Sequence, residues 1–201
     1  GGPLSPPITT WAFDAESQLT STTDPLGRTV QYQYDRLGRT ILETYPDPDG
    51  AGPSGSPEVR HTYDAVGNRI STVDPLGNET RFEYDDDYRL VAKTLPDPDG
   101  EAGPAASPLA TYVFDAADQL IHSTDPLGRK TSFQYDALGR LTEQADPDPD
   151  GEGPLKAPVT RYAYDPIGNL TAVTDALDNT TDYRYDNLYR RTTRILPDPD
   201  G

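Results

Sequence analysis

The sequence lacks cysteine and methionine and has only two histidines in 201 residues. The absence of cysteine excludes a disulfide framework and thiol chemistry. Without cysteine and with so few histidines, neither a zinc site nor a nucleophilic enzyme is expected. Because methionine is missing even at position 1, we expect the chain to be a section of a longer repetitive protein.

Basic and apolar residues are also scarce. There are 17 Lys and Arg against 34 Asp and Glu, and the net charge of −17 at pH 7 makes nucleic acid and anionic membrane surfaces poor partners. Hydrophobic residues make up 33% of the chain, with neither a signal peptide nor an apolar run long enough to span a bilayer. The 21 Pro and 17 Gly favour disorder, but 13 Tyr in a regular pattern favour a thin, turn-rich β structure.

An aromatic residue followed by Asp recurs eight times, at spacings that alternate between 21 and 29 or 30 residues. The string Pro-Asp-Pro-Asp-Gly at 46–50, 96–100, 147–151 and 197–201 has the same larger period. A period of about fifty residues indicates an array or solenoid. We therefore divide the chain into four units of one continuous array, 1–50, 51–100, 101–151 and 152–201. The aromatic-Asp pairs are Phe13-Asp14, Tyr34-Asp35, Tyr63-Asp64, Tyr84-Asp85, Phe114-Asp115, Tyr135-Asp136, Tyr164-Asp165 and Tyr185-Asp186.

The segments between these markers alternate in polarity with period two. In unit one, Val30, Tyr32 and Tyr34 fall on one face of a strand, while Gln31 and Gln33 fall on the other. We predict an all-β fold of antiparallel hairpins with about four strands per unit, one face buried and the other solvated. In unit one the predicted strands are 8–13, 19–23, 28–34 and 39–45.

The predicted turns share one chemistry, with Asp first and Gly fourth, which is typical of type I turns. The Asp carboxylate accepts a backbone N–H two residues on, and Gly adopts a left-handed conformation at no steric cost. Five turns replace the Gly. Because Tyr adopts this conformation poorly, we expect a changed turn at Tyr88 and Tyr189. The five replacements are Ser17, Tyr88, Asp118, Asp178 and Tyr189.

The segments 34–39 (YDRLGR) and 135–141 (YDALGRL) resemble the YD repeat of RHS proteins, teneurins and toxin-complex shells. The segments 23–28 and 124–129 are similar to the stretch between such repeats, and the resemblance covers nearly the whole chain apart from four Pro/Gly loops. It implies a strip of β-hairpins that spirals along an axis and closes into a hollow shell. Such shells enclose a toxin domain in bacteria or serve adhesion in teneurins. The two-repeat unit here is more regular than is typical of these families.

The YD pairs allow two interpretations. The rings could form a ladder on which a ligand stacks, or each ring could pack in the core while each Asp fixes a turn. We favour packing, because burying an aromatic ring contributes about 1.5–3 kcal/mol and eight rings could hold a thin core.

The acidic loops are the best candidates for a bound ion. Asp146, Asp148, Asp150 and Gly151 form the D-x-D-x-D-G opening of a calcium loop, without its distal Glu. The alternative is one more turn built from Asp, Pro and Gly. The other copies keep two acids each: Asp47 and Asp49, Asp97 and Asp99, Asp198 and Asp200.

We expect a structural repeat module of an extracellular or cell-surface bacterial fibre, without enzymatic activity. The alternatives are a wall section of an RHS-type shell around a toxin domain, and an adhesion module whose loops bind a partner or glycan. The expected partners are further copies of the repeat, with lateral self-association, and neither nucleic acid nor membrane insertion is expected. Apart from Leu155, the loop middles vary among small, Pro and charged residues, which weakens the adhesion hypothesis.

Overall fold

The computed structural model describes residues 6–50, 55–100, 106–151, 153 and 155–198, and throughout these ranges it contains strands, turns and loops but no helix. Accordingly, no helix in this part of the chain is long and apolar enough to cross a membrane. The chain divides into two compact units, Gly1–Ser107 and Pro108–Gly201. The all-β prediction is confirmed.

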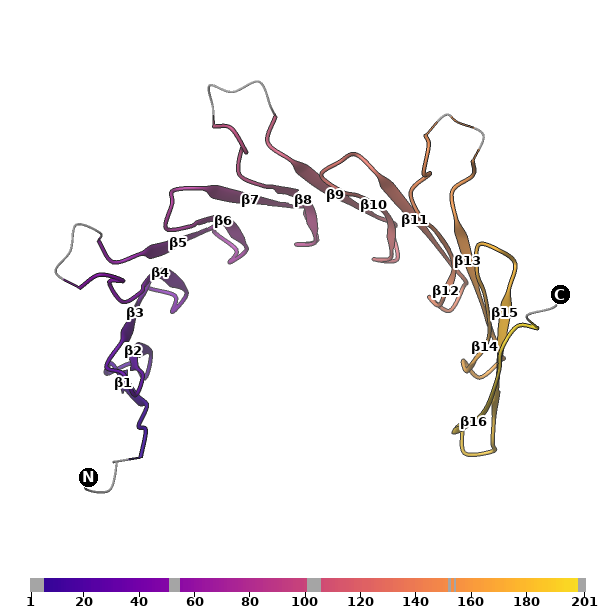
Figure 1. Cartoon of the computed structure of the whole chain (residues 1–201), viewed down its shortest axis with the longest axis horizontal. Helices are drawn as coiled ribbons and strands as arrows, with labels where there is room; N and C mark the ends of the chain where they lie inside the picture. The colour runs from indigo at the N-terminus through magenta and orange to yellow at the C-terminus, as the bar shows by residue number, and fades with distance from the viewer. Residues whose placement is uncertain (1–5, 51–54, 101–105, 152, 154, 199–201) are drawn as a thin grey trace. The chain divides into compact units, whose positions relative to one another are not determined.

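The first unit holds β1 to β8 and the second holds β9 to β16 (Figure 1). In the first fifty-residue repeat, residues 1–50, the bounds of β2 and β4 lie within one residue of the predicted bounds. The strands of the first unit are β1 (Thr10–Phe13), β2 (Leu19–Thr23), β3 (Thr29–Tyr34), β4 (Thr40–Thr44), β5 (Glu58–Tyr63), β6 (Arg69–Val73), β7 (Glu79–Tyr84) and β8 (Leu90–Thr94). Those of the second unit are β9 (Leu109–Phe114), β10 (Leu120–Thr124), β11 (Lys130–Tyr135), β12 (Leu141–Ala145), β13 (Val159–Tyr164), β14 (Leu170–Thr174), β15 (Thr180–Tyr185) and β16 (Arg191–Ile195).

Within each unit every strand pairs antiparallel with its neighbours in the sequence. Because the direction alternates, the connections fall on two opposite rims of the strip (Figure 1). One rim, here called the YD rim, carries the turns from each odd-numbered strand to the next strand, all of which follow a YD pair. The other, the loop rim, carries the turns after β2, β6, β10 and β14 and the long loops after β4, β8 and β12.

The predicted alternation is present, but the aromatic face is half-buried rather than buried. In β3, Val30, Tyr32 and Tyr34 are half-buried, whereas Gln31 and Gln33 are exposed. Among the residues that the structure describes, only Ala110, at 8% exposed, and Ser71, at 7%, are buried. A single-layer sheet has no second layer to cover it, so its side chains shield one another only along the strip.

The expectation of a changed turn at Tyr88 and Tyr189 was wrong. Both residues adopt the left-handed conformation, with φ of 62° and 60°, as the glycines do elsewhere. The Tyr88 N–H donates to the Asp85 carbonyl at 3.0 Å, as in the glycine-containing turns. The hydrogen bonds of the turn therefore outweigh a conformational cost of about 1–2 kcal/mol.

Candidate functional site

Each YD turn is fixed by its Asp, as the first one after β3 illustrates. The Gly38 N–H donates to the Asp35 carbonyl at 3.0 Å, and the Asp35 N–H donates to the Arg39 carbonyl at 2.9 Å. Asp35 Oδ1 accepts the backbone N–H groups of Leu37 at 2.9 Å and Arg39 at 3.0 Å. Asp35 Oδ2 accepts Nε of Arg39 at 2.6 Å. The loop between Asp35 and Arg39 has three residues, and the last of them, Gly38, adopts the left-handed conformation.

The residue four positions after the Asp completes the turn, and the sequence analysis missed its role. Arg or Asn at this position donates from its side chain to Asp Oδ2, while its backbone N–H donates to Oδ1. The signal was in the sequence, because Arg or Asn stands there in ten of the twelve hairpin turns. Those pairs are Asp24–Arg28, Asp35–Arg39, Asp64–Asn68, Asp74–Asn78, Asp85–Arg89, Asp125–Arg129, Asp136–Arg140, Asp165–Asn169, Asp175–Asn179 and Asp186–Arg190.

These bonds favour the ionised carboxylates. The Arg39 side chain, followed by its backbone N–H, holds the pKa of Asp35 below the ordinary value. Burial raises the pKa of Asp64, but the hydrogen bonds from Asn68 and the turn amides outweigh it, so that this pKa is also lowered. These two carboxylates therefore act as hydrogen-bond acceptors rather than as proton donors.

The tyrosine hydroxyls of the YD pairs join neighbouring turns. Tyr34 donates to the Leu19 carbonyl at 2.8 Å, and Tyr63 donates to the Thr40 carbonyl at 2.8 Å. In each case the acceptor is the first residue of a strand that leaves the preceding YD turn. Phe13 and Phe114 lack the hydroxyl. The remaining bonds are Tyr84 to Arg69, Tyr135 to Leu120, Tyr164 to Leu141 and Tyr185 to Leu170.

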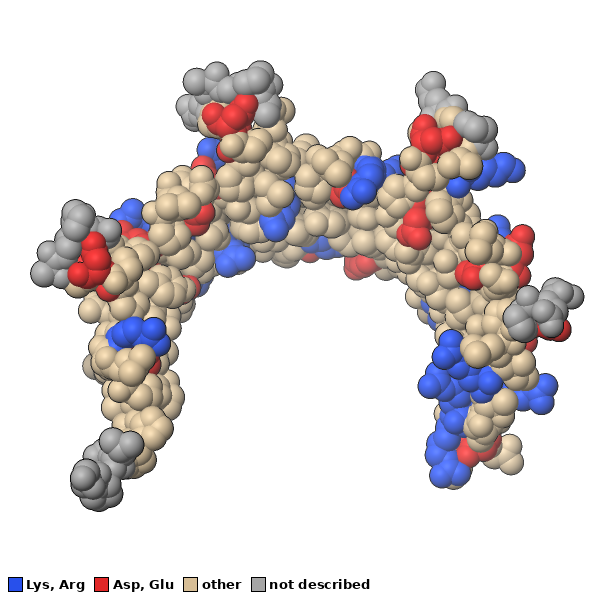
Figure 2. Space-filling view, viewed as in Figure 1, with Lys and Arg blue, Asp and Glu red and all other residues tan. Residues whose placement is uncertain are grey.

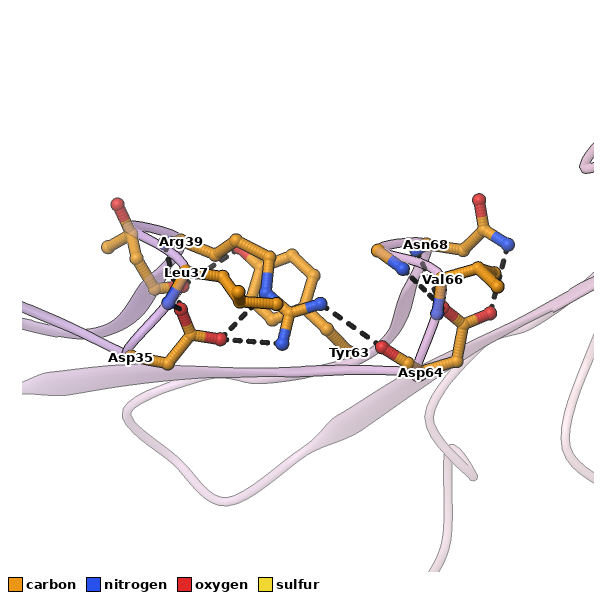
Figure 3. Close-up of polar contacts among 9 residues, drawn as sticks. Asp35, Leu37, Arg39, Tyr63, Asp64, Val66 and Asn68 are labelled. Atoms are coloured by element: carbon orange, nitrogen blue, oxygen red, sulfur yellow. Dashed lines mark hydrogen bonds and ion pairs between the residues drawn. The ribbon is translucent and has the colours of Figure 1, made fainter.

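Arg39 adds a second link between turns, across the β4–β5 pair (Figure 3). Its Nη1 donates to the Asp64 carbonyl at 3.1 Å, and its guanidinium lies 4.6 Å from the centre of the Tyr63 ring. Arg140 repeats both contacts in the second unit, at 2.9 Å to the Asp165 carbonyl and 4.8 Å to the Tyr164 ring. Arg39 and Arg140 therefore each link the second YD turn of one fifty-residue repeat to the first YD turn of the next repeat.

The YD tyrosines are engaged in contacts within the strip. The YD rings of Tyr63 and Tyr164 carry an arginine on one face, and their hydroxyls are already engaged. Within the described ranges, every buried side-chain N or O atom has a hydrogen-bond partner. The contacts along the YD rim therefore hold neighbouring turns together.

The acidic loops lie on the loop rim, where Figure 2 shows Asp and Glu beside the loops after β4 and β12. The loop after β4 is closed at its base by the Tyr45 N–H, which donates to the Pro57 carbonyl at 2.8 Å. Asp47 and Asp148 each accept the N–H of the Asp two positions on, at 3.1 and 3.2 Å.

In the part of the chain with described coordinates, no group of three acidic or histidine side chains is placed to hold a metal ion. Asp97 accepts the N–H of Asp99 in the same way as Asp47, and Asp146 accepts the amide of Gln144 at 2.7 Å. Asp198 is described, but Asp200 lies outside the described residues. Calcium binding in these loops stays a prediction.

A single sheet of repeated hairpins, whose turns are hydrogen-bonded to one another, is typical of a structural repeat protein. The family model of the RHS repeat matches residues 13–50, 63–102, 114–151 and 164–200, so the chain belongs to the RHS repeat family. No curated protein matches the chain.

Solved structures of Tc toxins share the fold. The chain superposes on a TcdB2–TccC3 complex without its hypervariable C-terminal region with a TM-score of 0.69 and 19% identity, over 94% of this chain. A mutant form of the Photorhabdus luminescens Tc holotoxin pore gives a TM-score of 0.70 and 20% identity, over the same share of this chain. In both comparisons the chain spans 10% of the length of the other protein.

Proposed function

We propose that this chain is a section of the wall of a hollow RHS-type shell. The observation that carries the proposal is the single-layer sheet, in which Ala110 is the only buried apolar residue in the described ranges. A sheet with strands in sequence order and no second layer is suited to enclose a space rather than to fill one. The fold that it shares with Tc toxin structures supports the same function.

Electron microscopy of the full-length native protein tests this proposal. Closed particles with internal density would support a wall that encloses another domain. Long threads of uniform width would contradict it and would support the fibre that the sequence also predicts.

The fibre is the second candidate, and the regular period of the repeats favours it. The YD pairs keep spacings of 21 and 29 or 30 residues throughout, and a filament needs such monotony along its length. Adhesion through the loops is a weaker third hypothesis, tested by glycan or cell binding with loop-exchanged variants.

For each candidate we expect a bacterial protein outside the cell or at its surface, of which this chain supplies four repeat units, and we expect no enzymatic activity. Its partners would be further copies of the repeat. Weak calcium binding by the acidic loops is a separate proposal, supported by the recurrence of paired Asp residues at each loop. An unchanged melting temperature when calcium is replaced by a chelator would contradict it.

A further inference from the structure

Arg39 shows how a YD turn receives an arginine side chain from the preceding turn. Its guanidinium carbon lies 4.6 Å from the centre of the Tyr63 ring, and its Nη1 donates to the Asp64 carbonyl at 3.1 Å (Figure 3). That carbonyl also accepts the Gly67 N–H, because a carbonyl oxygen has two lone pairs. The face of a YD ring and the carbonyl beside it can therefore bind a guanidinium group.

The next pair of YD turns has the same geometry but lacks the arginine. The strands β6 and β7 pair in the same register as β4 and β5, and the Tyr84 hydroxyl makes the equivalent bond, to the Arg69 carbonyl. In this register Asn68 takes the place of Arg39. Its side chain donates to Asp64 Oδ2 at 2.9 Å, within its own turn, and is too short to lie over the next ring. In the described part of the chain, no arginine or lysine lies over the Tyr84 ring.

A groove of about 550 Å³ lies where the arginine is missing, and five of its ten lining residues are aliphatic or aromatic. Two of these are largely exposed, Val66 at 63% and Tyr88 at 60%. Arg69 already lies 5.2 Å over the ring of Phe82, which leaves the two tyrosine rings for a ligand. The five aliphatic and aromatic residues are Val66, Ile70, Phe82, Tyr84 and Tyr88.

The charged residues that line the groove are all acidic. Neither Lys nor Arg is among them, whereas Asp64, Glu83, Asp85 and Asp86 are. Asp64 and Asp85 are bonded within their own turns. Glu83 and Asp86 are exposed, and within the described ranges their carboxylates have no hydrogen-bond or ion-pair partner. A cationic ligand would therefore meet unpaired negative charge beside aromatic rings.

The opening of this groove follows from a pair of residues that alternates between the repeats. In the first and third fifty-residue repeats a glutamine reaches the glycine of the next turn, and Gln18 Nε2 lies 3.0 Å from the position that a Cβ on Gly38 would take. In the second and fourth repeats an asparagine replaces the glutamine and a tyrosine replaces the glycine. The short asparagine leaves space, and the tyrosine forms one wall of it. The pairs are Gln18–Gly38, Gln119–Gly139, Asn68–Tyr88 and Asn169–Tyr189.

We propose that the groove binds an arginine side chain from an exposed basic segment of a partner protein. The guanidinium would lie over the Tyr84 ring and donate to the Asp85 carbonyl, in the two contacts that Arg39 makes one turn earlier. Glu83 and Asp86 would supply the opposite charge. Arginine fits better than lysine, because its planar group stacks on a ring and donates from its edge at the same time. Binding here does not depend on whether the strip closes into a shell.

The second unit supplies a matched control. Asn169, Tyr185 and Tyr189 repeat the asparagine and both tyrosines, but Arg184 and Asn187 replace the two unpaired acids. Arg184 is exposed, so this place should repel an arginine rather than bind it.

NMR titration of the isotope-labelled 201-residue chain tests the proposal, with the tripeptide acetyl-Gly-Arg-Gly-amide as the probe. We expect the amide signals of Tyr84 and Tyr88 to shift, with a dissociation constant of about 1 mM. Asn68→Arg should weaken binding at least about tenfold, because the new side chain takes the place of the ligand. Asn169→Arg adds the same charge at the same turn position and should change the dissociation constant by less than about twofold.

Asn68→Arg should fold, because a Cβ on Gly67 would lie 4.0 Å from Arg39 Nη1, which is an ordinary contact. An arginine therefore tolerates a side chain at this position of the next turn, and circular dichroism melting checks the fold. Glu83→Gln combined with Asp86→Asn keeps the shape of the groove and removes its unpaired charge. This double variant should weaken binding about threefold or more.

Three results would overturn the proposal. The first is the absence of any shift at Tyr84 and Tyr88 at about 10 mM peptide. The second is equal weakening by Asn68→Arg and Asn169→Arg, which would indicate general attraction to a chain with a net charge of −17. The third is equal binding of acetyl-Gly-Lys-Gly-amide, which would show that the planar contacts of arginine are not used.

Discussion

At the scale of single residues, the YD tyrosine differs from phenylalanine by one bond that the structure uses. Tyr63→Phe removes the 2.8 Å hydrogen bond to the Thr40 carbonyl and leaves the ring and its arginine in place. We expect a loss of about 0.5–1.5 kcal/mol in the free energy of unfolding, measured by urea denaturation. Tyr88→Phe is the control, because Tyr88 is 60% exposed and lies outside this row of bonds. Equal effects of the two substitutions would contradict the role of the hydroxyl row.

Tyr88 offers the opposite case, a residue that is poorly suited to its backbone. Its φ of 62° lies in the left-handed region, which asparagine adopts far more readily than tyrosine. Tyr88→Asn should therefore stabilise the chain by about 0.5–1 kcal/mol, seen as a higher urea midpoint. Destabilisation would mean that contacts of the ring exceed the backbone strain. Leu76→Asn, at an 86% exposed turn tip, should have little effect.

Some contacts of a single residue can be predicted from its neighbours in the sequence, whereas others depend on the pairing of strands. That Asp35 fixes a turn follows from its chemistry alone, and the structure adds that both of its oxygens are used. That Arg39 reaches a turn 25 residues away depends on the pairing of β4 with β5, which no local pattern contains. Tyr88 was misjudged because local preference was weighed without the closing bonds of the hairpin.

At the scale of the hairpin, two arginines in equivalent turns separate local from inter-repeat effects. Arg28 and Arg39 make the same contacts with Asp24 and Asp35, but Arg28 is 65% exposed and Arg39 only 25%. Only Arg39 of these two also reaches Asp64 and the Tyr63 ring. Lysine keeps the charge but cannot reproduce this set of planar contacts.

We therefore expect Arg39→Lys to destabilise the chain by about 1 kcal/mol. Arg28→Lys should change stability by less than about 0.5 kcal/mol. Urea denaturation of both variants provides the comparison. If Arg28→Lys is as costly as Arg39→Lys, the coupling across β4–β5 contributes nothing measurable.

The turn carboxylates also predict how stability depends on pH. The pKa values of Asp35, Asp64 and Asp136 are lowered in the folded chain, so the unfolded chain binds more protons in acid. This contribution is fully present above the unfolded pKa of about 3.9 and is lost as the pH falls through the lower folded values. Thermal melts should show a nearly constant midpoint from neutral pH to about pH 5 and a steep decrease below about pH 4.

Asp35→Asn and Asp136→Asn together supply the control for that profile. Each asparagine keeps an acceptor oxygen but does not titrate, so the double variant should be less stable at neutral pH and less sensitive to acid. An unchanged acid slope would show that other carboxylates dominate.

At the scale of the whole molecule, the repeat explains why the fold was predictable and the burial was not. Tyr34 and Tyr63 stand at fixed positions in the period, so the strands, their antiparallel order and the turns follow from the sequence pattern alone. The half-buried state of Tyr32 and Val30 was not predictable, because alternation shows which face is apolar but not whether a second layer covers it. A groove lined by Asp24, Val30 and Pro46 depends in the same way on how the loop after β4 folds back beside the turn after β2.

The same architecture predicts how stability scales with length. Contacts such as those of Tyr63 and Arg39 join one turn to its neighbour, so stability should approach a sum over repeats and their shared boundaries. A chain of residues 6–107 should fold alone, with a lower urea midpoint than the 201-residue chain. Its denaturant slope should be about half as large, in proportion to the surface exposed on unfolding.

Arg39→Lys in the short chain completes this test. The short chain keeps the contacts of Arg39 with Asp64 and Tyr63 but lacks those of Arg140. The substitution should therefore lower the urea midpoint of the short chain more than that of the full chain. Equal midpoints for the short and full chains would mean that repeats do not support one another. In that case the tyrosine hydroxyl bonds and the contacts of Arg39 and Arg140 would stabilise individual hairpins and would add no coupling between repeats.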